Sequence, residues 1–157
     1  MFEVYTFKEP GLLASFAHDL CLEGTPRVSF SGAQVTVRVA IASLRVRGQV
    51  RSGAVTPLSS RDHDDIQATL CAKVLDAPRH PEALYIGEVG ADAVEGALTL
   101  LGRTLPLRLP FSGRGGEATG EVELAPSRWG VVPYQALLGQ LRLQDRVRVR
   151  YSWPLPG

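Results

Sequence analysis

The adjacent residues His18 and Asp19 are the pair in this sequence best suited by residue type to acid–base chemistry. A histidine can act as a general base when a carboxylate orients its ring. Adjacent residues of a strand point to opposite faces, however, so Asp19 is poorly placed to orient His18. The sequence also has no Gly-x-Ser-x-Gly motif to supply a serine nucleophile. A hydrolase-like enzyme that uses His18 is therefore kept as an alternative to a structural or ligand-contacting histidine.

Metal ligation is the second chemistry to consider. The residues that could take part are His18, Cys21, His63, Cys71 and His80. Only His18-x-x-Cys21 is a close pair, and no second pair completes a tetrahedral set. We expect no metal and no other cofactor, apart from a possible bound lipid, and we interpret Cys71 as a buried thiol on the apolar face of a helix.

Arginine accounts for all but two of the 17 basic residues. It recurs in two segments, often at every second position, which predicts solvated outer faces of strands that discourage edge-to-edge pairing. The 17 basic residues meet 16 acidic ones, so the net charge of +1 creates no general attraction for nucleic acid. Since no aromatic residues interleave with these arginines along the chain, we expect no nucleic-acid partner, although an anionic lipid head group is another use for them. The two segments contain Arg38, Arg45, Arg47, Arg51, Arg142, Arg146, Arg148 and Arg150.

Alternation with period 2 dominates the chain and predicts a mainly β protein with about eight strands. Pro106 and Pro110 cannot donate to a ladder, which places their strand at an edge or a bulge. A change of parity predicts a β-bulge near Ala42-Ser43. The expected strands are 2–7, 35–41, 44–46, 84–89, 93–101, 104–111, 120–124 and 143–153, with glycine-rich hairpin turns at 90–92, 102–103 and 113–116.

One amphipathic helix is predicted to begin near Ser60 and to end before Pro78. Its apolar stripe must pack onto another element, and it consists of Ile66, Leu70, Cys71, Val74 and Leu75. A short apolar stretch at 12–16 predicts a helical segment near the N-terminus.

The length of 157 residues suits one domain over 1–157. The first residues show neither a basic region nor an apolar region of an export signal, so we expect a cytoplasmic protein. No stretch approaches the roughly 18 apolar residues of a membrane-spanning helix. Short antiparallel strands in this number favour an eight-stranded barrel or a sandwich.

An eight-stranded barrel is either filled by its own side chains or holds one ligand. Here the inward candidates are mainly Val, Leu, Ile and Ala, so a cavity would be apolar. Burial of each CH₂ gains about 0.8 kcal/mol, whereas association costs roughly 4–15 kcal/mol. A ten-carbon chain would hardly bind and a chain of twenty or more carbons could bind well, so a cavity predicts a long-chain lipid as the partner.

The order of several segments resembles the YceI-like family of lipocalin-like barrels. These segments are 16–20 (FAHDL), 74–77 (VLDA), 96–104 (GALTLLGRT), 129–130 (WG) and 134–139 (YQALLG). The resemblance extends over nearly the whole chain. It implies an eight-stranded antiparallel barrel, with the helix capping or flanking it, and non-enzymatic binding of a polyisoprenoid, an isoprenoid quinone or a fatty-acid-like lipid inside.

If the chain forms such a barrel, we expect ten residues to contact the ligand. They are Phe16, His18, Val39, Ile41, Leu98, Leu100, Leu109, Phe111, Trp129 and Tyr134. A structural or protein-interaction module without a ligand, for instance a homodimer, is the remaining alternative, and it would show an exposed apolar patch or a dimer interface.

Overall fold

The computed structural model describes residues 1–8, 19–132, 135–136 and 141–155, and the side chains of residues 135, 136, 141 and 142 are not described. Thirteen strands, one α-helix and three short helical turns are found in these ranges. The strands are β1 (Phe2–Lys8), β2 (Leu20–Gly24), β3 (Arg27–Ser31), β4 (Gln34–Ala40), β5 (Arg45–Arg51), β6 (Ala54–Thr56), β7 (Glu82–Val89), β8 (Ala93–Leu100), β9 (Arg103–Pro110), β10 (Ser112–Arg114), β11 (Glu117–Leu124), β12 (Gln135–Ala136) and β13 (Leu141–Pro154). The helical segments are the 3-10 turn η2 (Ile41–Ser43), the helix α1 (Ser60–Thr69), the π turn η3 (Leu70–Val74) and the 3-10 turn η4 (Pro126–Trp129).

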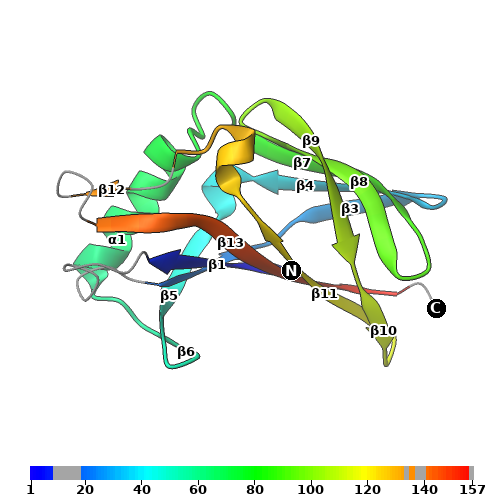
Figure 1. Cartoon of the computed structure of the whole chain (residues 1–157), viewed down its shortest axis with the longest axis horizontal. Helices are drawn as coiled ribbons and strands as arrows, with labels where there is room; N and C mark the ends of the chain where they lie inside the picture. The colour runs from blue at the N-terminus through cyan, green and yellow to red at the C-terminus, as the bar shows by residue number, and fades with distance from the viewer. Residues whose placement is uncertain (9–18, 133–134, 137–140, 156–157) are drawn as a thin grey trace.

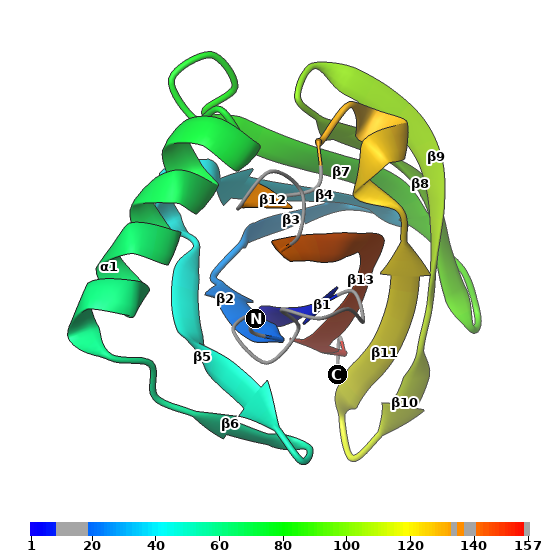
Figure 2. The same cartoon turned by 60° about the vertical axis from the view of Figure 1, so that its left-hand side comes forward.

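The strands form two antiparallel sheets that surround a common interior, with α1 along one side (Figures 1 and 2). The larger sheet has eight strands in the order β10-β11-β13-β1-β2-β5-β6, with β12 paired to β13. The smaller sheet has five strands in the order β3-β4-β7-β8-β9. Within the described residues no helix is long and apolar enough to cross a membrane.

The mainly β fold with one amphipathic helix is confirmed, but the closed eight-stranded barrel is wrong. The described strands number thirteen and lie in two sheets. The sequence prediction missed the short strands β3, β6 and β10. β6 and β10 have three residues each and lack an apolar alternation, whereas the alternation of β3 consists of Val28 and Phe30 alone. It also missed β2 and the two-residue β12.

The junction of β9 and β11 shows why no continuous ladder closes the sheets there. Proline has no N–H to donate, and the strand that carries Pro106 and Pro110 is an edge strand, as predicted. Tyr151, on β13, donates its hydroxyl to the carbonyl of Pro110 at 2.6 Å, so this carbonyl has a side-chain partner. Gly120, on β11, permits the close approach, since a Cβ there would lie 2.1 Å from the Pro110 oxygen.

The expected β-bulge near Ala42-Ser43 is wrong as well. The parity changes because the 3-10 turn η2 carries the chain from β4, in the smaller sheet, to β5, in the larger one. The N–H of Ile41 donates to the carbonyl of Pro81 at 2.9 Å, which fixes this corner to the loop before β7.

The predicted helix is confirmed at its start and broken into two parts at its end. Ser59 accepts a hydrogen bond from the N–H of Asp62 at 3.2 Å and is the N-cap residue. α1 ends at Thr69, one π turn continues to Val74, and Asp76 then takes a left-handed conformation with φ 46° before Pro78. The segment at 12–16, where a short helix was expected, lies outside the described residues.

Candidate ligand-binding cavity

A cavity of about 880 Å³ lies between the two sheets. It is at the upper end of the roughly 300–1,000 Å³ that small-molecule pockets span. Alternate residues of the strands supply most of the lining, because every second side chain of a strand faces the interior. They include Phe2, Val4 and Thr6 of β1, Val35, Val37 and Val39 of β4, Leu107 and Leu109 of β9, and Val147, Val149 and Tyr151 of β13.

The helix completes one side of the cavity with the apolar stripe that the sequence predicted to pack onto another element. Ile66, Leu70, Val74 and Leu75 all line the cavity, while Cys71 does not. None of the residues of α1 and η3 is fully buried. The stripe therefore faces a space, where a tightly packed helix would face other side chains.

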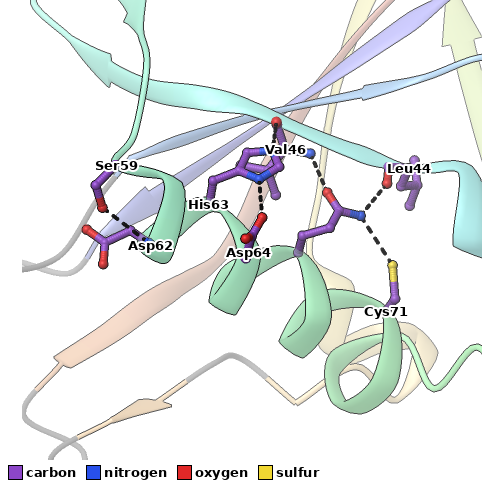
Figure 3. A network of polar contacts seen from close by, with 8 residues as sticks. Leu44, Val46, Ser59, Asp62, His63, Asp64 and Cys71 are labelled. Atoms are coloured by element: carbon purple, nitrogen blue, oxygen red, sulfur yellow. Dashed lines mark hydrogen bonds and ion pairs between the residues drawn. The ribbon is translucent and has the colours of Figure 1, made fainter.

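Side chains of α1 hold the helix against β5 (Figure 3). Gln67 donates to the carbonyl of Leu44 at 2.6 Å and accepts from the N–H of Val46 at 2.8 Å. A ring nitrogen of His63, Nε2, lies 3.1 Å from the carbonyl oxygen of Val46, while Nδ1 lies 3.2 Å from a carboxylate oxygen of Asp64. Both backbone polar groups of Val46 are thus bonded by helix side chains, which fixes α1 beside the cavity.

The ionisable side chains on the described lining are acidic or phenolic. The carboxylates are Asp62 and Asp65 of α1 and Asp145 of β13, and no lysine, arginine or histidine is among the described lining residues. Asp145 accepts from the N–H of Ser127 at 2.9 Å and also from its hydroxyl. A basic side chain for an anionic ligand is therefore missing from the described wall of this cavity, which includes the N-terminal residue Met1.

Two tyrosine hydroxyls reach backbone carbonyls across the inner surface. Tyr85 donates to the carbonyl of Leu107 at 2.7 Å, and burial raises the pKa of Tyr85 to about 12. Burial likewise raises the pKa of Tyr151 to about 12. Both phenols stay neutral near pH 7 and serve as hydrogen-bond donors that tie strands together.

Five of the ten expected contact residues line the cavity, namely Val39, Ile41, Leu98, Leu100 and Leu109. Two others lie beside it. Phe111 packs edge-on against Trp153, with ring centroids 5.1 Å apart, and belongs to the core around Val35, Tyr85 and Val94. Trp129 is 1% exposed, donates from Nε1 to the carbonyl of Leu98 at 2.9 Å, and borders a second, smaller pocket. Phe16, His18 and Tyr134 lie outside the described residues.

The expected set omitted the lining residues of β1 and β13 and the helix stripe. Alternation does signal them, since Val147, Val149 and Tyr151 occupy one face of their strand and Arg146, Arg148 and Arg150 the other. The pattern separates two faces of a strand, and only the curvature of the sheets shows which face is turned inward.

The pair His18-Asp19 can be judged only from its second member. Asp19 accepts a hydrogen bond from the N–H of Lys8 at 2.7 Å, so its carboxylate joins the end of β1 to the start of β2. In the described part of the chain, no group of three or more His, Cys, Asp or Glu side chains is arranged to hold a metal ion. Both cysteines are free thiols.

The prediction for Cys71 is wrong, because this thiol is half-buried and Cys21 is the fully buried one. Cys21 lies on the outer face of β2, where its Sγ is 3.4 Å from a carboxylate oxygen of Glu3. Burial, followed by the hydrogen bond to Glu3, raises the pKa of the Cys21 thiol. Glu3 is in turn held by Arg47 at 2.7 Å, which completes the cover over the thiol.

The arginine faces are outward and carry cross-strand ion pairs. Four of these pairs join Arg38 to Glu82, Arg47 to Glu3, Arg146 to Glu123 and Arg150 to Glu121, at 2.7–3.1 Å. The prediction that these arginines have no aromatic neighbours is wrong. The guanidinium of Arg146 lies 4.1 Å from the ring centre of Phe7, and that of Arg150 lies 5.2 Å from the ring centre of Tyr5. The sequence pattern could not reveal these rings because they come from β1, at the other end of the chain.

Comparison with known proteins accounts for this combination of a sheet-enclosed cavity and a flanking helix. The model of the YceI-like domain matches residues 13–153. The chain belongs to the YceI-like family. The family that the sequence resembled is thus confirmed. A comparison with curated protein sequences gives no match.

Two solved structures support the same fold for this YceI-like chain. A structure described as a polyisoprenoid binding domain from Saccharophagus degradans is 11% identical, covers 99% of this chain and 93% of its own, and has a TM-score of 0.62. BcnA of Burkholderia cenocepacia is 16% identical, with 96% and 94% covered and a TM-score of 0.53. At these identities the likeness establishes the fold of the chain.

Proposed function

We propose that this YceI-like protein binds a long-chain apolar lipid, such as a polyisoprenoid, an isoprenoid quinone or a fatty-acid-like molecule, without catalysing a reaction on it. The observation that carries the proposal is the apolar cavity of about 880 Å³ between the sheets. The helix stripe supports it, because Ile66, Leu70 and Val74 face this space without being fully buried. The description of the Saccharophagus degradans domain as polyisoprenoid-binding is consistent with the same ligand class.

The size and character of the cavity favour a long chain. At about 0.8 kcal/mol per CH₂, a chain of twenty carbons gains about 16 kcal/mol, which exceeds the roughly 4–15 kcal/mol cost of association. A ten-carbon chain gains only about 8 kcal/mol, which lies within the range of the association cost and leaves little free energy for binding. The ligand is therefore a lipid whose chain carries most of the binding free energy.

Several expectations from the sequence stay predictions beside this proposal. The hydrolase-like alternative depends on His18, which lies outside the described residues. The cytoplasmic location, the single domain over 1–157, the absence of a cofactor and of a nucleic-acid partner, and the possible homodimer likewise stay predictions. A module without a ligand is the alternative that the following experiment separates from lipid binding.

The test combines extraction of the purified protein with a matched pair of variants on β7. Ala83 lines the cavity, whereas Ile86 lies on the outer face of the same strand and is 41% exposed. We expect mass spectrometry of an organic extract to find a long-chain lipid in the wild type and in Ile86→Trp. Ala83→Trp places an indole in the cavity, so it should reduce the bound lipid and the binding of added geranylgeraniol at least tenfold. Equal lipid content and equal geranylgeraniol binding in the two folded variants, or no binding by the wild type, would refute the proposal.

A further inference from the structure

A second pocket of about 320 Å³ lies beside the large cavity, and its lining is basic. Three elements contribute basic side chains, namely Lys73 of η3, His80 before β7, and Arg103 at the start of β9. The one carboxylate in the lining, Asp76, already lies 3.8 Å from the guanidinium of Arg79. The rest of the lining consists of Val74, Leu101, Trp129, Gly130 and Val132.

The basic side chains of this pocket have N–H donors for which no acceptor is found among the described residues. Arg103 uses Nη1 to donate to the carbonyl of Arg128 at 3.0 Å, and a guanidinium has five N–H donors in all. For the side chains of Lys73 and His80, no hydrogen bond or ion pair is found among the described residues. The ring of His80 lies close to Gly102, since a Cβ added there would be 3.3 Å from Cε1, and His80 and Arg103 line the same pocket. The donors therefore converge without a protein anion that satisfies them.

The basic pocket and the large cavity share two lining residues. Val74 and Val132 line both, and Val132 is 71% exposed, so the boundary between the two spaces lies at the surface. Trp129 forms a fixed part of this boundary, because it is buried and bonded to the carbonyl of Leu98, which itself lines the cavity. Figure 2 shows η4, which contains Trp129, and the end of α1 on the same rim of the space that the sheets surround.

Charge differs sharply between the two spaces. Among the side chains of the described residues, the cavity lining holds three carboxylates and no lysine, arginine or histidine, whereas the pocket lining holds Lys73, His80 and Arg103 and one carboxylate, which lies near Arg79. An anionic oxygen group is repelled by the first set and attracted by the second. An apolar chain has the opposite preference, since the described cavity wall is almost entirely hydrocarbon.

We infer that the basic pocket binds the anionic head group, a phosphate or a carboxylate, of a lipid whose chain occupies the large cavity. This inference depends on the proposed lipid binding and adds the class and the orientation of the ligand. The head group lies among Lys73, His80 and Arg103, and the chain passes Val74 and Val132 into the cavity. Arginine suits this role because its planar fork can donate two hydrogen bonds to one phosphate or carboxylate.

The experiment compares two ligands with the same chain, geranylgeraniol and geranylgeranyl monophosphate. At low salt the wild type should bind the phosphate at least tenfold more tightly, and added salt should weaken only the phosphate. Arg103→Gln should remove about tenfold of the affinity for the phosphate, equivalent to about 1.4 kcal/mol, and leave the alcohol unchanged. Arg103→Lys keeps the charge and should retain part of the preference. Arg108→Gln is the matched control, because Arg108 is on the same strand and pairs with Glu95 at 2.7 Å on the outer face.

The outcomes separate this inference from the proposed function. Unchanged binding of the alcohol by Arg103→Gln shows that the cavity is intact in that variant. Equal affinity of the wild type for the two ligands, or an equal loss of phosphate affinity in Arg108→Gln, would overturn the head-group site while leaving lipid binding in place. Failure of the wild type to bind either ligand would overturn both. Binding of inorganic phosphate alone, dependent on Arg103 and without any lipid binding, would make the pocket a site for free phosphate and would contradict the lipid orientation.

Discussion

Replacement of Gln67 by methionine tests whether one side chain fastens the helix over the cavity. Met keeps the length of the side chain but can neither donate to Leu44 nor accept from Val46 in the same way. The N–H of Val46 loses its bond to Gln67, and this residue is only 3% exposed, so an unsatisfied donor costs about 1–3 kcal/mol. The carbonyl of Leu44 keeps a contact to the guanidinium of Arg45 at 3.0 Å, so its loss is smaller, about 0.5–1.5 kcal/mol.

The sum is a destabilisation of about 1.5–4.5 kcal/mol, which for a protein of this size lowers Tm by roughly 3–18 °C. Urea denaturation followed by circular dichroism measures the free energy of unfolding directly. Ala68→Met is the control, because Ala68 is the next residue of α1 and is exposed, and it should change the free energy by less than about 0.5 kcal/mol. Because the helix lines the cavity, Gln67→Met should also release geranylgeraniol faster than the control. A free energy of unfolding for Gln67→Met equal to that of Ala68→Met would refute the assigned role of Gln67.

Two further predictions concern buried titratable groups. An unfolded tyrosine ionises near pH 10, whereas burial holds the pKa of Tyr85 at about 12, so folding stability is complete below pH 10 and falls as the pH rises toward 12. Tyr85 should account for a loss of roughly 2–3 kcal/mol over this window in urea titrations, in addition to the loss from Tyr151, so Tyr85→Phe should show a shallower decline; an identical decline would contradict the assignment. The thiol of Cys21 is fully buried and has a raised pKa, so a thiol reagent such as DTNB should modify the half-buried Cys71 first and reach Cys21 only on unfolding. Rapid labelling of native Cys71→Ser would show that Cys21 is accessible.

Much of the secondary structure could be predicted because its signals are local. The hairpin between β8 and β9 turns at Leu101 and Gly102, both at positive φ, where the sequence offers a Gly-Arg pair after an apolar run. The start of α1 follows from a serine before a group of aspartates. β3 was missed because it has five residues, of which only Val28 and Phe30 contribute an apolar alternation.

Half of the expected contact residues do line the cavity, and the reason is again periodicity. Val39, Leu98 and Leu109 alternate with residues of the opposite face, and such alternation is visible in one dimension. The residues of the basic pocket gave no such signal. Lys73 and His80 are seven positions apart, on a helical turn and in a loop, and Arg103 follows more than twenty positions later on a strand.

The strand-rich character, the hairpins, the helix and the family can be inferred without a structure, because each depends on neighbours along the chain or on the order of segments. Three features depend on packing in space: which strand face is the cavity wall, the arrangement of the strands in two sheets instead of a closed eight-stranded barrel, and the meeting of three basic side chains beside an apolar space. A period of two defines two faces of a strand but does not show which face points inward. The valines of β1 and β13 point inward because these strands pack opposite β4. The convergence of Lys73, His80 and Arg103 likewise depends on where a helix, a loop and a strand cross in space.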